Sequence, residues 1–263
     1  MGSGIPLPSS CVNGGRPLFS AIAEWFSGVK AEFVLNFITK NRWKMMLTGL
    51  ENTLLITFVA GMMGIAIGVV VAIIRSTWDK NQETMRPGVG KFMFRVVNGI
   101  AKVYLTVIRG TPLVLQLLIM YFIIFASSRN DMMIAILAFG INSGAYVAEI
   151  FRSGIMSISK GQFEAGRSLG FNYVQTMIYI ITPQMIKNVL PTLLNEFIAL
   201  LKETSVAGYV TVMDLTYAAS RIRASTYSPF MPLVGSAAIY LALVMFFTWL
   251  VGLLERRLRK SER

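Results

Sequence analysis

Long apolar runs without a charged side chain divide this chain into segments. Four of them are long enough to approach or exceed the roughly 20 residues with which a helix crosses a bilayer: residues 52–74, 110–128, 132–148 and 224–254. Charged residues make up only 14% of the chain, against about a quarter in soluble domains. The pattern therefore predicts an all-α integral membrane protein.

A fifth crossing is predicted over residues 185–212, which are mostly apolar but interrupted by polar side chains. A charge at the centre of a bilayer costs about 2.5–3.5 kcal/mol, so such groups usually face a bundle interior or a wet cavity. We therefore expect about five transmembrane helices, the fifth with its polar side turned away from lipid. The polar residues are Asn188, Asn195, Glu196, Lys202 and Glu203.

The polar residues of this segment fall on two neighbouring rows of a helix. Asn188, Asn195 and Lys202 are seven residues apart and share a face, and Glu196 and Glu203 form the next row. One interpretation is a polar wall of a translocation path. The other is that these groups bond across a helix interface, with Lys202 and Glu203 near a membrane surface.

The two segments before the first crossing differ from it in composition. Residues 31–47 mix aromatic and aliphatic side chains with lysine and arginine, which is typical of a helix lying on the membrane surface. Residues 1–30 are expected to form a mobile tail outside the cell, without the order of a signal peptide. Cys11 is the only cysteine and the chain has no histidine, so no metal site is expected.

The net charge of +12 is explained by membrane orientation. With five crossings, the basic residues of 75–109, of 152–187 and of the tail 256–263 fall on one side. Cytoplasmic loops carry an excess of lysine and arginine. The C-terminus is therefore expected in the cytoplasm and the N-terminus outside, and nucleic-acid binding is not expected.

Residues 164–184, EAGRSLGFNYVQTMIYIITPQ, form a polar connector that is longer than a link between two spans requires. The sequence predicts a short helix over about 159–169 with Glu164 and Arg167 facing outward. Gly170 would allow the chain to turn, because glycine tolerates positive φ. The apolar run 177–181 would anchor the helix to the bundle, and Pro183 would break the chain into the next span.

Two further groups of polar residues allow alternative interpretations. Arg109, Thr111 and Pro112 form a turn at a span entrance, which either starts a helix with Arg109 near lipid phosphates or takes part in gating or in contact with an ATPase. Asn142 and Tyr146 lie in an apolar span and either line a path or bond across helices. Gly64 with Gly68, and Gly140 with Gly144, are expected to pack helices within one bundle.

The chain lacks the glycine-rich loop with which many ATPases hold phosphate. That motif needs Gly, four residues and then Gly-Lys-Ser/Thr. At Gly90-Lys91, Met85 replaces the first glycine and Phe92 follows the lysine. The chain is therefore not expected to bind ATP itself.

The connector carries a pattern that resembles a known family. Glu164-Ala165-Gly166, Gly170, Ile180 and Thr182-Pro183 are spaced like the EAA loop of permease subunits in ATP-binding-cassette importers. Gly166 and Thr182 depart from that pattern. Other stretches resemble the amino-acid-uptake branch: GLENTLLITFVAGMMGIAIGVVVAIIR from residue 49, IRGTPLVLQLLIMYF from 108, NSGAYVAEIFRSGI from 142 and LPTLLNEFIALLKETSVAG from 190.

The resemblance covers about residues 45–255 and implies a type I importer transmembrane domain in a bacterial inner membrane. With the surface helix before it, the permease domain is predicted over residues 31–255. Two such subunits, the same or sister chains, would enclose a path for a polar or charged amino acid. A solute-binding protein would deliver the substrate, and separate ATPase subunits would bind ATP and Mg. The coupling loop, 159–184, would contact the ATPase through Glu164, Ala165, Gly166, Arg167 and Gly170. On the first of the two interpretations given above, Asn142, Tyr146, Asn195, Glu196, Lys202 and Glu203 would line the path.

Two other function classes remain to be weighed against this reading. A secondary transporter driven by an ion gradient would more often show an inverted repeat, and five spans do not suggest one. A membrane-embedded enzyme would need a nucleophile, a metal or an acid–base cluster. Without histidine, the chain offers only scattered carboxylates for that purpose.

Overall fold

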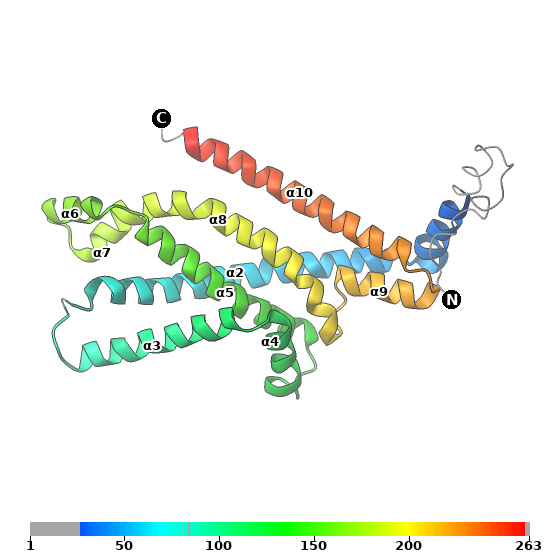
Figure 1. The fold of residues 1–263 in the computed structure, drawn as a ribbon, viewed down its shortest axis with the longest axis horizontal. Coiled ribbons are helices and arrows are strands. Elements are labelled where there is room, and N and C mark those ends of the chain that lie inside the picture. Colours follow the sequence, from blue (N-terminus) through cyan, green and yellow to red (C-terminus); the bar gives the residue numbers. More distant parts are fainter. Residues whose placement is uncertain (1–26, 84, 261–263) are drawn as a thin grey trace, which may run out of the picture. The chain divides into compact units, whose positions relative to one another are not determined.

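The computed structural model describes residues 27–83 and 85–260, with side chains to residue 257, and every regular element in these ranges is a helix (Figure 1). Most of the expected tail, 1–30, thus lies outside the described residues. The elements are η2 (Val34–Ile38), η3 (Thr39–Asn41), α2 (Trp43–Asn81), α3 (Val89–Gly110), α4 (Leu113–Ile119), η4 (Met120–Ile124), α5 (Asp131–Met156), α6 (Lys160–Ser168), α7 (Tyr173–Thr176), η5 (Met177–Ile181), α8 (Thr182–Glu203), η6 (Thr204–Val210), α9 (Leu215–Thr226) and α10 (Phe230–Lys260).

Three of the described helices, α2, α5 and α10, are long and apolar enough to cross a membrane, and α3 with α4–η4 qualifies as a fourth, broken crossing. The all-helical membrane architecture expected from the sequence is confirmed. α10 begins at Phe230 rather than at 224, because Tyr227, with φ 54°, ends α9 in a left-handed turn.

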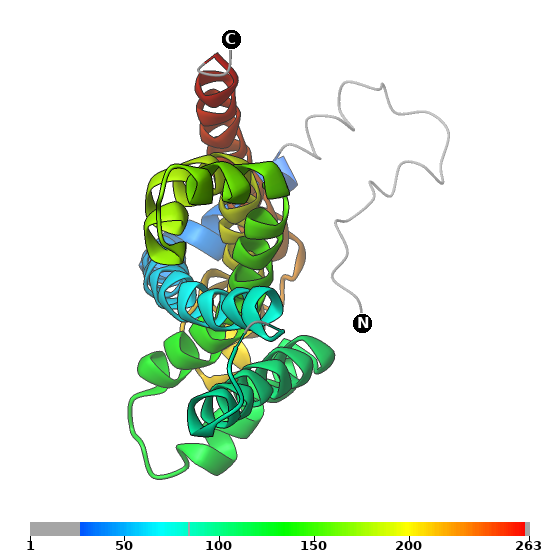
Figure 2. The same cartoon turned by 90° about the vertical axis from the view of Figure 1, so that its left-hand side faces the viewer.

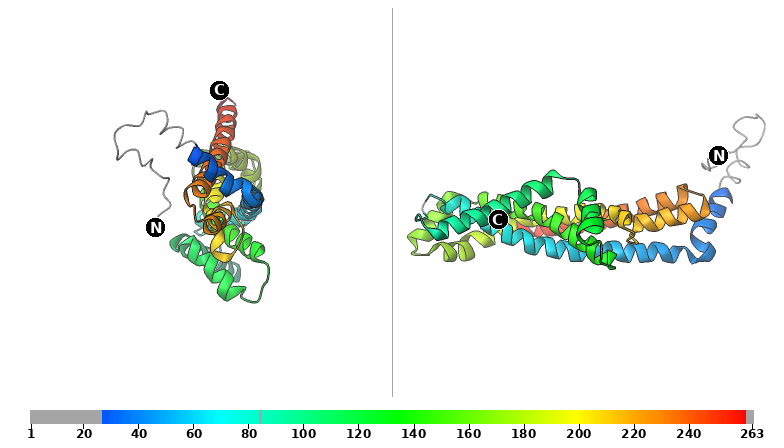
Figure 3. Two further views of the ribbon diagram at one scale, coloured as in Figure 1. Left: turned by 90° about the vertical axis from the view of Figure 1, so that its right-hand side faces the viewer. Right: turned by 90° about the horizontal axis from the view of Figure 1, so that it is seen from below.

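The largest departure from expectation lies between residues 75 and 128. The sequence suggests a cytoplasmic loop to 109 and then a span over 110–128. Instead, residues 89–110 form α3, and the chain then bends by 110° into the much shorter α4 and η4. The bend can be followed in the right-hand view of Figure 3. The sequence did not predict α3 as a span because the charges of Arg95, Lys102 and Arg109 break its apolar residues into short runs along the chain.

The expected fifth span also differs from the structure. α8 ends at Glu203, the 3₁₀-helix η6 follows, and α8 is not among the described helices that meet the length and composition for crossing. Pro183 does not break the chain, because Thr182 keeps helical angles and η5 runs into α8. The wider π-helical turn of η5 accommodates the missing N–H and the ring of a proline in the next turn.

The described residues divide into two compact units, 27–55 with 204–245, and 56–203 with 246–260, with boundaries inside α2, between α8 and η6, and inside α10. In the first unit, the start of α2 packs closely on α9. A Cβ atom at Gly49 would lie 2.8 Å from the carbonyl oxygen of Asp214. Asn52 Nδ2 donates to the Met213 carbonyl at 2.9 Å, and the Leu215 amide donates to Thr53 Oγ1 at 3.1 Å.

The segment expected to lie on the membrane surface, 31–47, is helical in two parts. Helical residues 27–38 are separated from α2 by Lys40 and Asn41, whose φ angles are 57° and 55°. The buried Asn36 holds η2 against the end of α9, since it donates to Ser228 Oγ at 3.1 Å and accepts from Thr226 Oγ1 at 2.8 Å. Its location at a membrane surface remains a prediction.

In the second unit, α2 and α5 approach through the two expected pairs of glycines. A Cβ atom at Gly64 would lie 2.9 Å from Ser143 Oγ, and one at Gly144 would lie 2.9 Å from Ile67 Cγ2. Gly68 and Gly140 face Val147 and Met63 in the same way. The prediction that these glycines pack helices within one bundle is confirmed. It leaves α5, with Phe139 and Val147 buried, at the centre of the unit.

Candidate functional site

The polar connector begins with α6, close to the helix expected over 159–169. Ser159 precedes it with extended backbone angles, and Leu169 follows it. Gly170 has φ 79°, so it makes the turn in the left-handed region that favours glycine, as predicted. Figure 2 looks at the second unit from the end that carries α6 and α7.

One face of α6 is exposed and the other is packed. Glu164, Ala165 and Arg167 are exposed, as expected for an outward face, whereas Gly166 is buried. A Cβ atom at Gly166 would lie 2.6 Å from Thr176 Cγ2 and 2.7 Å from Thr176 Oγ1. The departure from the family pattern at this position therefore has a steric reason, because glycine allows α6 to lie directly on the end of α7.

The segment behind α6 is held rigidly. The Asn172 and Gln175 side chains form a capping box at the start of α7, with both hydrogen bonds at 2.9 Å. η5 then inserts Ile181, which is fully buried, into a cluster with Ile155, Ile158, Met185 and Val189. The prediction that the apolar run anchors the connector to the bundle is confirmed.

The end of α2 contacts α6 through an aromatic ring. Lys80 Nζ lies 3.1 Å from the centroid of the Phe163 ring, a cation–π arrangement. A cavity of about 570 Å³ beside this contact is lined by Lys80, Glu164, Arg167 and Tyr173, among others. α6 therefore contacts α2 through the side chain of Phe163, in addition to following α5 directly in the chain.

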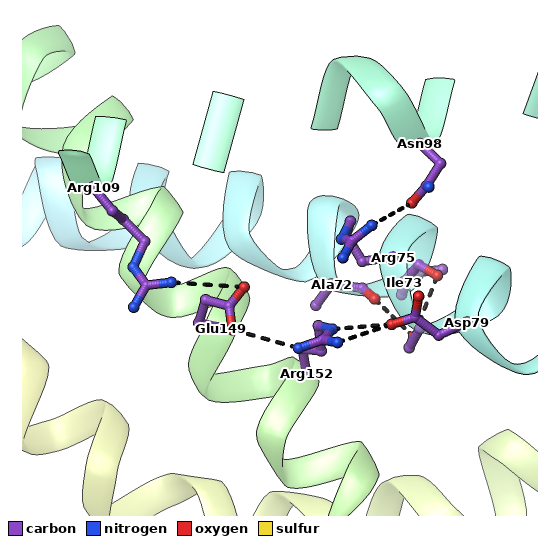
Figure 4. Close-up of polar contacts among 9 residues, drawn as sticks. Ala72, Ile73, Arg75, Asp79, Asn98, Arg109, Glu149 and Arg152 are labelled. Atoms are coloured by element: carbon purple, nitrogen blue, oxygen red, sulfur yellow. Dashed lines mark hydrogen bonds and ion pairs between the residues drawn. The ribbon is translucent and has the colours of Figure 1, made fainter. Parts of the chain in front are cut away.

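A charged network joins the ends of three helices (Figure 4). Arg152 of α5 donates to Asp79 of α2 from Nε at 3.1 Å and from Nη2 at 3.0 Å. Arg152 Nη1 also lies 3.7 Å from Glu149, whose other oxygen lies 3.7 Å from Arg109 at the end of α3. The side chains are 26–44% exposed, so the network is only partly shielded from solvent.

The sharp turn between α3 and α4 is held by one glutamine. Gln116 Nε2 donates to the Ile108 carbonyl at 2.7 Å, to the Thr111 carbonyl at 3.1 Å and to Thr111 Oγ1 at 2.8 Å. Its Oε1 accepts from Asn142 Nδ2 of α5 at 2.9 Å. Pro112 precedes α4 with extended backbone angles. Thr111 and Asn142 thus belong to one hydrogen-bonded group that fixes the bend.

The polar residues expected to line a path lie on α5 and α8 and do not form one group. Ser143 Oγ donates to Glu196 Oε1 at 3.4 Å, joining α5 to α8, while Asn195, Lys202 and Glu203 are exposed along α8. Tyr146 lies 5.7 Å from the Arg109 guanidinium, measured to the ring centroid. Asn142 contacts α4 rather than α8, so the structure does not bring it together with the α8 residues.

Several residues of these groups escaped the sequence analysis. Gln116 is the only polar residue of α4, a signal that was available. Glu149 and Arg152 are three residues apart on a helix, which favours an ion pair. Nothing in the sequence indicated that Asp79 meets Arg152 or that Phe163 meets Lys80, because both contacts join segments far apart in the chain.

One protein family and several known proteins are similar in sequence to this chain. Residues 88–260 match the family described as binding-protein-dependent transport system inner membrane component. The arginine transport system permease protein ArtQ of Bacillus subtilis is 36% identical over 82% of this chain and 93% of its own length. The putative glutamine transport system permease protein GlnP of Rickettsia bellii is 34% identical over 86% of this chain and 98% of its own.

Two solved structures of ABC transporters contain chains that are similar to this chain. A crystal structure of an amino acid ABC transporter with histidines contains a chain that is 37% identical, with a TM-score of 0.72, over 84% of this chain and 98% of that one. A chain of the MetNI methionine ABC transporter, in an inward-facing conformation, is 18% identical with a TM-score of 0.65. This second likeness concerns the fold alone.

Proposed function

We propose that this chain, which belongs to the family of binding-protein-dependent transport system inner membrane components, conducts a polar or charged amino acid. It is a permease subunit of an ATP-binding-cassette importer. It conducts the amino acid together with a second permease subunit, either a second copy or a sister chain. The names of its relatives, which transport arginine or glutamine, support this substrate class. The chain is a pore subunit and not itself an enzyme.

The partners of this chain follow from its type of subunit. An ATPase subunit binds ATP and Mg and supplies the energy, and an extracytoplasmic binding protein delivers the amino acid. The chain itself binds no nucleotide in this proposal, since its sequence lacks a phosphate-binding loop. ATP binding must favour one conformation of the pore through contacts that differ between the two states.

The single observation that carries the proposal is the packing of α6. Its exposed face presents Glu164, Ala165 and Arg167, while Gly166 fastens the opposite face to Thr176. A rigidly backed helix with an exposed polar face is suited to docking in a groove of a partner. We assign this face, with Gly170 at its end, to the ATPase subunit.

A continuous set of contacts leads from this helix toward the bend at Thr111. Phe163 of α6 touches Lys80, and the neighbouring Asp79 binds Arg152. Arg152 reaches Glu149, and Glu149 reaches Arg109, two residues before Thr111. Ion pairs of this kind can have two discrete arrangements. We assign to Arg109, Thr111 and Pro112 a role in gating through this network.

The substrate path is assigned to the polar side of α8 and the facing part of α5. Asn195, Glu196, Lys202 and Glu203 offer groups for both ends of an amino acid, and Ser143 positions Glu196. Asn142 and Tyr146 flank this region on α5, where they hold α4 and Arg109 respectively. Charged groups inside a membrane protein commonly mark a substrate pathway.

The orientation in the bacterial inner membrane follows from the basic residues. Lysine and arginine concentrate near α6, near the α2–α3 connection and after Leu254. The positive-inside rule then puts these segments and the C-terminus in the cytoplasm. In this proposal α8 is kept as a fifth crossing beside α2, α3 with α4–η4, α5 and α10, so the N-terminus lies outside. The orientation is consistent with the assignment of α6, because the ATPase subunit works in the cytoplasm.

The test is a charge reversal on α6 in the complete transporter, reconstituted with its ATPase and binding protein. Glu164→Lys is expected to abolish amino-acid uptake and binding-protein-stimulated ATP hydrolysis, while the amount of inserted permease stays unchanged. Glu83→Lys is the matched control, since Glu83 is also exposed but lies outside α6. Normal uptake by the Glu164→Lys transporter would overturn the docking assignment.

A further inference from the structure

We propose that a pocket beside α3 binds the phosphate group of an anionic membrane lipid through Arg75, Lys102 and Arg109. The pocket has a volume of about 460 Å³. Glu149 is the one acidic residue among those that line it, so three cations face one carboxylate. Thr106 contributes a hydroxyl group, which can donate a further hydrogen bond to an oxyanion.

An incompletely bonded guanidinium points to an anion at this place. Arg75 Nη1 donates to Asn98 Oδ1 at 3.0 Å. Among the described residues, however, Arg75 Nε is one of the buried side-chain atoms without a hydrogen-bond partner. Buried polar groups are nearly always bonded, and an exception calls for an explanation. Arg75 also lines the pocket, and a guanidinium has five N–H donors, so donors other than Nε and the one bonded to Asn98 are free to bind a phosphate there.

The level of the pocket along α2 fits a lipid head group. The charge-free run 52–74 ends directly at Arg75. At a rise of about 1.5 Å per residue, such a run spans roughly the hydrocarbon core of a bilayer. Arg75 therefore stands where the acyl chains end and the phosphates begin.

The exposed side of α3 makes the pocket accessible from lipid. Apolar side chains on this helix are strongly exposed: Phe92, Val96, Ile100, Val103 and Val107 are 45–65% exposed. Lys102 and Arg109 are seven residues apart and share a neighbouring face. Lipid can therefore contact the apolar face of α3 beside the basic residues that line the pocket. Basic pockets between helices at a membrane surface bind anionic lipids.

Lys102 offers the cleanest test, because it is exposed and lies outside the network that joins Arg109 to Asp79. The complete transporter is purified in mild detergent, and retained phosphatidylglycerol is measured by native mass spectrometry. Removing one cation near a membrane surface is expected to weaken lipid binding about five-fold. Lys102→Gln should therefore lose phosphatidylglycerol, and Lys102→Arg should retain it.

Lys91→Gln is the matched control, since Lys91 lies on the same helix but does not line the pocket. It should retain as much phosphatidylglycerol as the wild type. Equal retention by Lys102→Gln and the wild type would overturn the proposal. A transported amino acid carries a carboxylate with similar oxyanion chemistry. If added amino acid displaced the lipid, or if Lys102→Gln raised the KM of uptake without changing lipid retention, the pocket would belong to the substrate and the proposal would be wrong.

Discussion

The ammonium group of Lys80 lies over the ring of Phe163, with 3.1 Å between Nζ and the ring centroid. Lys80 is the penultimate residue of α2, and Phe163 lies in the middle of α6. The residue beside Lys80, Asp79, binds Arg152 of α5. The pair therefore joins the helix assigned to ATPase docking to the charged network.

The first prediction tests whether this contact couples ATP hydrolysis to amino-acid transport. Phe163→Leu removes the ring but keeps apolar volume, and a cation–π contact contributes about 0.5–2 kcal/mol. We expect ATP hydrolysis to continue while the amount of amino acid transported per ATP falls several-fold. Phe163→Tyr keeps the ring and should behave like the wild type. Unchanged transport per ATP in the Phe163→Leu protein would show that the contact is only structural.

The second prediction concerns the close contact beneath α6. Gly166→Ala would place a methyl group against Thr176, and overpacking of this kind costs about 1–3 kcal/mol. The variant should hold its ATPase subunit less firmly during purification and should be cut faster by protease within residues 160–176.

Thr176→Ala provides the compensating change, because it removes Thr176 Cγ2 and Oγ1, the two atoms that a Cβ at Gly166 would approach most closely, at 2.6 and 2.7 Å. The double variant Gly166→Ala, Thr176→Ala should recover most of the lost ATPase binding. If the single and double variants behave alike, the steric explanation for glycine at 166 fails.

The third prediction concerns the bend between α3 and α4. Gln116→Leu removes the donor for Ile108 and Thr111 and the acceptor for Asn142. An unsatisfied buried group costs about 1–3 kcal/mol, so the thermal midpoint in lipid nanodiscs should fall by several degrees.

Thr111→Val is the comparison variant for this bend, because it makes a smaller change than Gln116→Leu. It removes a single hydroxyl acceptor of Gln116 and leaves the other contacts of the glutamine in place. Its effect on the thermal midpoint should be clearly smaller. Equal effects of Gln116→Leu and Thr111→Val would mean that Gln116 does not organise the turn.

The fourth prediction concerns pH and Asp214, which caps α9. Its carboxylate accepts from the Thr216 amide at 2.8 Å and the Tyr217 amide at 3.2 Å. Burial nevertheless raises the pKa of Asp214 above its ordinary value, against the effect of these hydrogen bonds. The folded protein therefore holds this proton more tightly than the unfolded chain does.

The sign of the pH effect follows from linkage. The stabilisation from the bound proton is fully present below the ordinary aspartate pKa and is lost as the pH rises through the raised pKa of the folded state. Asp214→Asn cannot titrate, so the thermal midpoint of the wild type relative to this variant should rise as the pH is lowered from neutrality. A constant difference between the two midpoints across that range would contradict the raised pKa.

The sequence by itself determined the class of the protein and the nature of its connector. Runs of apolar residues specify membrane helices because a bilayer satisfies no backbone hydrogen bond. The turn at Gly170, the exposed side of α6 and the anchor at 177–181 also followed from local chemistry, in which glycine, charge and apolar periodicity act over a few residues.

Tertiary structure decided where helices meet and where they bend. The sequence did not predict α3 as a membrane helix, because charges such as Lys102 and Arg109 leave no long charge-free run in residues 89–110. The bend after Gly110 depends on Gln116 meeting Asn142 of another helix. The contacts of Lys80 with Phe163 and of Asp79 with Arg152 join residues more than 70 positions apart. No local pattern specifies such pairs, because they arise only when the packing of whole helices brings their side chains together.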